Sequence, residues 1–132
     1  MKSMFAMLAM ALCLVGASVF AGDKVEDITH DDLVKAVKDK KVVLIDCNGS
    51  GSFKEGHIPG AVDFDSAKDE LAKKLPADKN ALVVAYCGNE HCPAYKSGAE
   101  AAQKLGYTNV KHYAGGIAGW KKSGEATEKA AN

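Results

Sequence analysis

The chain has 132 residues, enough for one domain with its own hydrophobic core and too few for two domains of ordinary size. The charges of its 17 basic and 17 acidic residues cancel. The composition therefore indicates neither the basic surface typical of nucleic-acid binding nor a cationic face for anionic membranes. We therefore expect no nucleic-acid partner. All of the basic residues are lysines.

The N-terminal segment has the pattern of a secretory signal peptide. Lys2 provides a positive start, an apolar run follows, and Val19-Phe20-Ala21 offers the small residues that a signal peptidase reads. A run of this length could also anchor a protein in a membrane, but it is rich in alanine and no positive flank follows it. We predict that residues 1–21 are removed, that residues 22–132 form one domain, and that the protein is periplasmic or secreted with no membrane partner after cleavage.

Helix and strand patterns alternate after this segment. The capping box Thr29-x-x-Asp32 precedes apolar residues at helical spacing and predicts a helix over Asp31–Asp39. The aliphatic run Val42–Asp46 predicts a strand that is buried on both faces. Asn48–Ser52 is rich in glycine, serine and asparagine and therefore predicts a loop.

The middle of the chain continues the alternation. Ile58-Pro59-Gly60 predicts a turn, and Ala61–Phe64 predicts a short strand after it. A second capping box, Ser66-x-x-Asp69, predicts a helix that ends at Leu75, just before a proline.

The last third begins with a second strongly apolar run. The predicted elements are, in order, a buried strand over Ala81–Tyr86, a helix over residues 94–105, a short strand over Asn109–Tyr113, a short helix over Ile117–Lys122 and a frayed tail over Glu125–Asn132. This alternation predicts an α/β fold with a mostly parallel sheet. Ligands of such sheets bind beyond the carboxyl ends of the strands.

Two cysteines, Cys87 and Cys92, lie at that place in the stretch AYCGNEHCPAYKSG (residues 85–98). Haem attachment requires Cys-x-x-Cys-His, which the Cys-x4-Cys spacing does not provide. A zinc site made of Cys87, His91 and Cys92 lacks a second pair of ligands downstream, since His112 stands alone. An inert buried cysteine is a further alternative. We expect no metal and no cofactor.

The position of Cys87 instead suits a nucleophile. A cysteine between a buried strand and a helix lies among backbone N–H groups, and the helix N-terminus adds partial positive charge. Both effects are expected to lower the thiol pKa, and the thiolate is the nucleophile. Cysteine phosphatases share this arrangement but require an arginine six residues after the cysteine, where this chain has Pro93 and no arginine anywhere. Phosphatase chemistry is excluded.

Three segments resemble the rhodanese-like family. LIDCNGSGSFKEGHIPGAVDF (residues 44–64) is similar to its first strand and its Gly-His-Ile-Pro-Gly-Ala signature. VVAYC (residues 83–87) resembles its strand and nucleophilic cysteine, and LGYTNVKHYAGGIAGWKKSG (residues 105–124) resembles its C-terminal segment. The resemblance implies a single rhodanese-like domain, with a central mostly parallel sheet flanked by helices on both faces.

The resemblance also implies a sulfurtransferase. Cys87 would carry a sulfane sulfur as a persulfide from a small anion such as thiosulfate to a thiol, to cyanide or to a protein acceptor. The loop and the following helix would bind the donor, through the residues Gly88, Asn89, Glu90, His91, Cys92 and Lys96. The usual Asp-x-Arg after the first strand is Asp46-Cys47-Asn48 here, and a lone lysine binds thiosulfate more weakly than an arginine fork.

Two other functions remain open from the sequence. Cys87 and Cys92 could form a disulfide in an oxidising compartment and act in thiol–disulfide exchange or persulfide carriage. The domain could also be a non-catalytic binding module. We interpret His57 as architectural, Trp120 as a packing residue and Cys47 as a small core residue.

Overall fold

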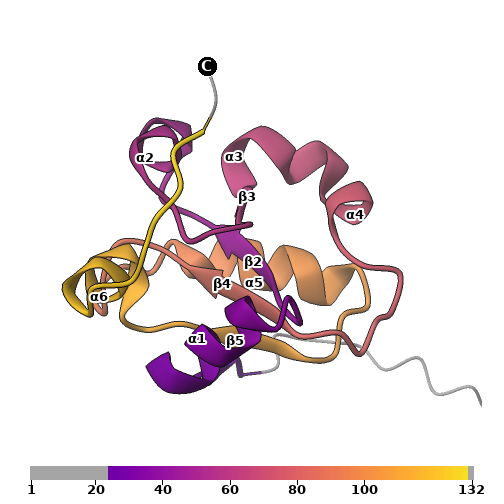
Figure 1. Ribbon diagram of the computed structural model, residues 1–132. Helices are drawn as coiled ribbons and strands as arrows, with labels where there is room; N and C mark the ends of the chain where they lie inside the picture. The colour runs from indigo at the N-terminus through magenta and orange to yellow at the C-terminus, as the bar shows by residue number, and fades with distance from the viewer. Residues whose placement is uncertain (1–23, 131–132) are drawn as a thin grey trace, which may run out of the picture.

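A computed structural model describes residues 24–130 and shows one parallel sheet of five strands (Figure 1). The spatial order is β1-β5-β4-β2-β3, and every neighbouring pair is parallel. The strands are β1 (Glu26–Asp27), β2 (Val43–Asp46), β3 (Val62–Asp63), β4 (Val83–Tyr86) and β5 (Val110–His112). The predicted signal peptide lies outside the described residues.

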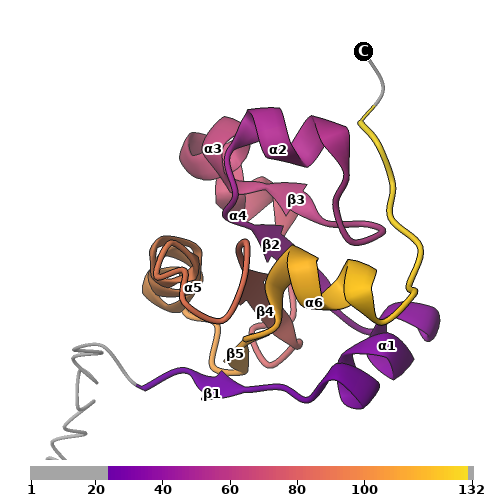
Figure 2. The same ribbon diagram turned by 90° about the vertical axis from the view of Figure 1, so that its left-hand side faces the viewer.

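Helices cover both faces of the sheet, as Figure 2 shows, which confirms the predicted α/β fold. One face carries α5 (Tyr95–Lys104) together with α3 (Phe64–Ala67), the 3-10 helix η1 (Lys68–Glu70) and α4 (Leu71–Lys74). The other face carries α1 (His30–Lys38) and α6 (Gly116–Lys122). The remaining helix, α2 (Ser50–Glu55), follows β2.

The two central strands are apolar on both sides because each side faces its own core. Ile45 and Ala85 pack toward α4 and α5 with Leu71 and Ala99. The alternate strand residues pack toward α1 and α6, where the buried side chains are Leu33, Leu44, Ile58, Val84, Tyr86, Tyr113 and Trp120. The uninterrupted aliphatic runs of the sequence are thereby explained.

Two local predictions were wrong, and one strand was not predicted. The predicted loop over Asn48–Ser52 contains the start of α2, which opens after Gly49 at φ 88°. The second capping box is not used: the side chain of Asp63 accepts a hydrogen bond from the Asp65 N–H, so the helical segment begins at Phe64. Strand β1 has only two residues, both acidic, so no strand pattern is visible in the sequence. It forms because β5 pairs with it.

The C-terminal tail is also more ordered than predicted. Glu128 pairs with His57 in an antiparallel bridge, with two backbone hydrogen bonds of 2.9 Å. The Trp120 indole donates to the Ala126 carbonyl at 2.8 Å. The tail therefore closes over α6 and the turn that precedes β3. None of the helices in residues 24–130 is long and apolar enough to span a membrane.

Candidate active site

Cys87 follows the last residue of β4 at the carboxyl edge of the sheet, where the sequence predicted a ligand site. Its side chain is 1 % exposed. The Cys47 N–H donates to the Tyr86 carbonyl at 2.9 Å, so Cys47 lies beside Cys87 where β2 and β4 end. The three cysteines of the described residues, Cys47, Cys87 and Cys92, are free thiols.

Backbone hydrogen bonds from the start of α6 fix the loop after Cys87. The Ile117 N–H donates to the Cys87 carbonyl at 2.9 Å, and the Ala118 N–H donates to the Gly88 carbonyl at 3.0 Å. Gly116, with φ 62°, permits this approach: a Cβ atom there would lie 2.6 Å from the Cys87 carbonyl oxygen. Only glycine fits this position, because both the left-handed backbone and the contact exclude a side chain.

A tight turn then brings the chain back over the thiol. The Asn89 side chain accepts a hydrogen bond from the His91 N–H at 2.9 Å, and the Asn89 carbonyl accepts one from the Cys92 N–H at 3.2 Å. As a result, the Cys87 thiol donates to the Cys92 carbonyl at 3.1 Å. The loop encloses the sulfur.

Burial raises the pKa of the Cys87 thiol to about 11, and the hydrogen bond to the Cys92 side chain contributes to the rise. The N–H groups of Tyr95 and Gly88 act in the opposite direction, as the sequence predicted for loop amides, but they do not overcome desolvation. The prediction of a lowered pKa for Cys87 was therefore wrong for the enclosed thiol.

Cys92 has the lower pKa of the two. Burial opposes its ionisation, but hydrogen bonds from the Cys87 thiol and from the N–H groups of Gly88 and Ala94 together bring the pKa below its usual value. The two thiols interact, raising the pKa of Cys87 and lowering that of Cys92, so the ionisation of one affects the other. Cys92 is thus the first thiolate of the pair.

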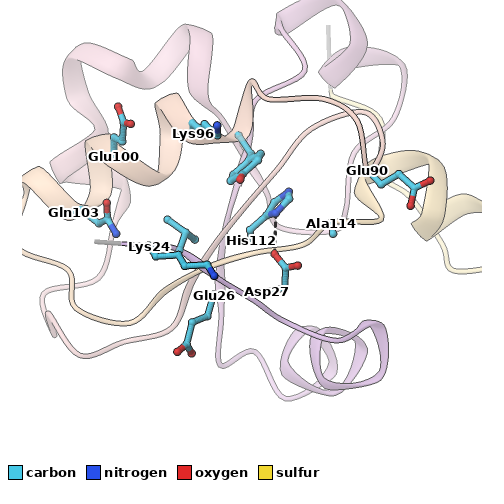
Figure 3. Close-up of a pocket in the computed structure, with 11 residues that line it drawn as sticks. Lys24, Glu26, Asp27, Glu90, Lys96, Glu100, Gln103, His112 and Ala114 are labelled. Atoms are coloured by element: carbon cyan, nitrogen blue, oxygen red, sulfur yellow. Dashed lines mark hydrogen bonds and ion pairs between the residues drawn. The ribbon is translucent and has the colours of Figure 1, made fainter. Parts of the chain in front are cut away.

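The remaining predicted binding residues do not gather at the sulfur. Glu90 and His91 are exposed and face each other at 3.4 Å between Oε1 and Nε2. Lys96 is exposed on α5 and lines a cleft of about 750 Å³ with Glu90, shown in Figure 3. Within residues 24–130, no group of three His, Cys, Asp or Glu side chains is arranged to hold a metal ion.

A buried polar network supports the edge of the sheet next to the site. The Tyr86 hydroxyl donates to Asp46 Oδ2 at 2.8 Å and accepts from the Ile58 N–H at 3.1 Å. The second oxygen of Asp46 accepts from the Asn48 N–H at 2.8 Å. Burial nevertheless raises the pKa of Asp46, since these hydrogen bonds offset desolvation only in part.

The residues interpreted as structural make structural contacts. His57 is 5 % exposed, stacks on Phe53 with ring centroids 3.7 Å apart, and hydrogen-bonds the Phe53 carbonyl at 2.8 Å. Trp120 is 3 % exposed in the core cluster. Cys47 packs against the core beside Gly98, and burial raises the pKa of its thiol to about 12.

Sequence reasoning missed two features of the site. Gly116 belongs to a Gly-Gly pair that a search for close backbone approach could have found. Tyr95 has no sequence pattern that would mark it as part of the site, because both of its contacts are tertiary. Its N–H faces the Cys87 sulfur, and its ring stacks on His112 with centroids 3.4 Å apart. Only the tertiary structure brings these groups together.

Comparison with known proteins identifies the family of the chain. Residues 29–123 match the family described as Rhodanese-like domain. The chain is 31% identical over 97 residues to thiosulfate sulfurtransferase GlpE of Coxiella burnetii, covering 73% of this chain and 87% of that protein. It is also 29% identical over 119 residues to an HTH-type transcriptional regulator of Mycobacterium tuberculosis, covering 89% of this chain but only about half of that protein (51%).

A solved structure shows the same fold. The 3-mercaptopyruvate sulfotransferase SseA of Escherichia coli superimposes with a TM-score of 0.64 at 19% identity, over 82% of this chain and 52% of that one. The family match covers most of the sequence and includes Cys87 and its loop. The chain therefore belongs to the rhodanese-like family, which includes sulfurtransferases.

Proposed function

We propose that this protein is a sulfurtransferase that moves a sulfane sulfur from a donor such as thiosulfate to a thiophilic acceptor through a persulfide on Cys87. The observation that carries the proposal is the enclosed Cys87 thiol at the end of β4, with the N–H groups of Gly88 and Tyr95 facing its sulfur. The family membership and the sulfurtransferase relative support it.

The reaction proceeds in two displacements. The Cys87 thiolate attacks the outer sulfur of thiosulfate, the sulfur–sulfur bond of the donor breaks, and sulfite leaves with the electron pair. The terminal sulfur of the resulting persulfide carries the negative charge, which the loop N–H groups stabilise. An acceptor such as cyanide then attacks that sulfur and releases the Cys87 thiolate.

Donor binding is expected to be weak. Lys96 is the nearest cation that the sequence places after the loop, and it is a point charge on an exposed helix face rather than a bidentate fork. We therefore expect a high KM for thiosulfate and a rate limited by the small fraction of Cys87 thiolate near neutral pH.

Mass spectrometry of the intact reduced protein tests this function. Incubation with thiosulfate should add one sulfur atom, and cyanide should remove it. Cys87→Ser should accept no sulfur while retaining its circular dichroism. Cys47→Ala is the matched control, since Cys47 is a neighbouring thiol with a pKa raised to about 12, and it should still be sulfurated. A wild-type protein that gains no sulfur would instead favour a non-catalytic binding module.

A second function is favoured by one specific feature, the return of Cys92 to the Cys87 sulfur, which donates to the Cys92 carbonyl at 3.1 Å and whose pKa the Cys92 thiol affects. Two thiols this close can exchange a disulfide or resolve a persulfide by attack of one on the other. Thiol–disulfide exchange requires both cysteines, whereas sulfur transfer to cyanide requires only Cys87. The activity of Cys92→Ala separates the two functions.

The compartment is part of the same proposal. We propose that the protein is exported to the periplasm or secreted, on the basis of the N-terminal signal pattern in the sequence. N-terminal sequencing of material from the periplasmic fraction should begin at Gly22. A protein that retains residues before Ser18 would contradict cleavage.

A further inference from the structure

His112 presents a buried ring nitrogen that the structure leaves without a partner. The side chain is 8 % exposed, and its Nδ1 lies 3.0 Å from Oδ1 of Asp27. Its Nε2 makes no hydrogen bond to any group within residues 24–130. An unpaired buried polar atom costs about 1–3 kcal/mol, so such atoms are uncommon unless they serve a function.

The hydrogen bond to Asp27 defines what the free nitrogen can do. A carboxylate only accepts, so Nδ1 carries the proton that it donates to Asp27. Burial lowers the pKa of His112, although Asp27 opposes the shift, and the ring is therefore neutral near pH 7. In this tautomer Nε2 holds a lone pair, so His112 accepts a hydrogen bond from a ligand.

His112 lies in the wall of the cleft between β1, β5 and α5 (Figure 3). The charged residues that line this cleft are Lys24, Glu26, Asp27, Glu90, Lys96 and Glu100. Acidic groups thus outnumber basic ones around a hydrogen-bond acceptor, with Glu26 paired to Lys111 at 3.3 Å and Asp27 paired to His112 itself. This lining favours a ligand that carries a positive charge and N–H donors, such as an ammonium group.

The cleft adjoins the nucleophile although Cys87 does not line it. The Cys87 loop contributes Glu90 to the wall, and α5 contributes Tyr95, whose N–H faces the Cys87 sulfur and whose ring stacks on His112. The register places His112 opposite Ala85, so the side chains of His112 and Cys87 project from the same face of neighbouring strands.

We propose that this cleft binds the sulfur acceptor, a small thiol that carries an ammonium group, and that His112 Nε2 accepts a hydrogen bond from the ammonium. The inference rests on the proposed function, because the acceptor thiolate then attacks the outer sulfur of the Cys87 persulfide. A new sulfur–sulfur bond forms on the acceptor, the Cys87–sulfur bond breaks, and Cys87 leaves as a thiolate. Water takes the proton of the acceptor thiol.

Nε2 is covered in the structure, so ligand entry requires a local movement. The half-buried ring of Tyr95 stacks on the imidazole with centroids 3.4 Å apart and lines the same cleft, so the proposal requires the Tyr95 side chain to move when a ligand binds.

Acceptor kinetics test the proposal. Cysteamine and 2-mercaptoethanol are compared as acceptors at equal thiolate concentrations, because they differ in the ammonium group. His112→Asn retains an N–H donor for Asp27 but removes Nε2, and it should lower the ratio of kcat/KM for cysteamine to that for 2-mercaptoethanol by about tenfold. His112→Gln, whose amide oxygen can accept at the position of Nε2, should retain more of the preference.

Lys122→Gln is the control, since Lys122 is an exposed lysine of α6, on the other face of the sheet from the cleft. It should leave the ratio unchanged. A wild-type protein without a preference for cysteamine would overturn the proposal. An equal fall of kcat/KM for cysteamine and for 2-mercaptoethanol in His112→Asn would also overturn it, because that result indicates a purely structural role for His112.

A binding measurement separates this inference from the proposed function. Ethanolamine carries the ammonium but no thiol, so its binding does not depend on sulfur chemistry. In a long-range ¹H–¹⁵N spectrum, titration with ethanolamine should shift the His112 Nε2 resonance of the wild-type protein. Absence of any shift at saturating ethanolamine would overturn the cleft assignment. A shift in a protein that gains no sulfur from thiosulfate would retain the site and reject the reaction.

Discussion

The hydroxyl of Tyr86 donates a hydrogen bond of 2.8 Å to the carboxylate of Asp46, and both side chains are at most 1 % exposed. This pair joins the ends of β2 and β4 directly beneath the Cys87 site. The same hydroxyl accepts the Ile58 N–H, so one side chain also fixes the turn that precedes β3.

Tyr86→Phe should lower the free energy of unfolding by about 2–4 kcal/mol, because it leaves a buried carboxylate oxygen and the Ile58 N–H without a partner. The Tyr86 hydrogen bond lowers the pKa of Asp46, which burial raises. Its loss therefore raises that pKa further, and the destabilisation should be larger at about pH 7 than at about pH 4. Urea titrations at the two pH values measure this. An equal loss at both would contradict the role assigned to the carboxylate.

Alkylation should distinguish the two thiols of the loop. In reduced wild-type protein, iodoacetamide should modify Cys92 first near neutral pH, because its pKa is lowered while that of Cys87 is raised to about 11. In Cys92→Ala, Cys87 should react faster at neutral pH, since the hydrogen bond that contributes to its raised pKa is gone. Peptide mapping after timed alkylation gives both rates, and a slower Cys87 in the variant would contradict this coupling.

A disulfide between Cys87 and Cys92 should form when an oxidant such as dissolved oxygen removes two electrons and two protons from the pair. The loop already brings Cys92 back to the Cys87 sulfur, which lies 3.1 Å from the Cys92 carbonyl oxygen. Protein isolated without reductant should carry the bond in a substantial fraction of molecules, and Cys92→Ala should transfer sulfur without prior reduction. Free labelling of both thiols in unreduced protein would exclude the disulfide.

Gly116→Ala should displace the Cys87 loop and strongly reduce sulfur transfer, because its Cβ would lie 2.6 Å from the Cys87 carbonyl oxygen. Gly124→Ala is the matched control. Gly124 also has a positive φ, 82°, but a Cβ there has no neighbour within 4 Å. Both variants should lose about 1 kcal/mol or more from backbone strain, and only Gly116→Ala should lose activity. Equal activity in the two variants would show that this approach does not position the loop.

Gly98→Ala tests the structural role of Cys47. A Cβ at this position of α5 would lie 2.6 Å from the Cys47 sulfur and 2.9 Å from Cγ2 of Ile45. Overpacking should lower stability by about 1–3 kcal/mol, despite the better helix propensity of alanine. Cys47→Ala in the same background should recover part of the loss, as a double-mutant cycle on denaturation midpoints would show. No coupling between the two positions would contradict this packing.

The sequence by itself determined the fold class and the position of Cys87 in it. Aliphatic runs without polar interruption, such as Val83–Tyr86, require burial on both faces and hence a parallel sheet with two helical layers. Cys87 then had to lie at the carboxyl edge, because a residue that ends a buried strand and precedes a helix has no other place in this architecture.

Tertiary structure alone decided the chemistry around that residue. The pKa of Cys87 depends on how completely its loop encloses the sulfur, and neither desolvation nor the contact with Cys92 can be derived from their spacing in sequence. The same holds for His112. Its Nδ1 bonds to Asp27 of an edge strand, 85 positions away in the sequence, and its Nε2 has no partner within residues 24–130. Such contacts depend on the packing of distant segments, which local patterns do not encode.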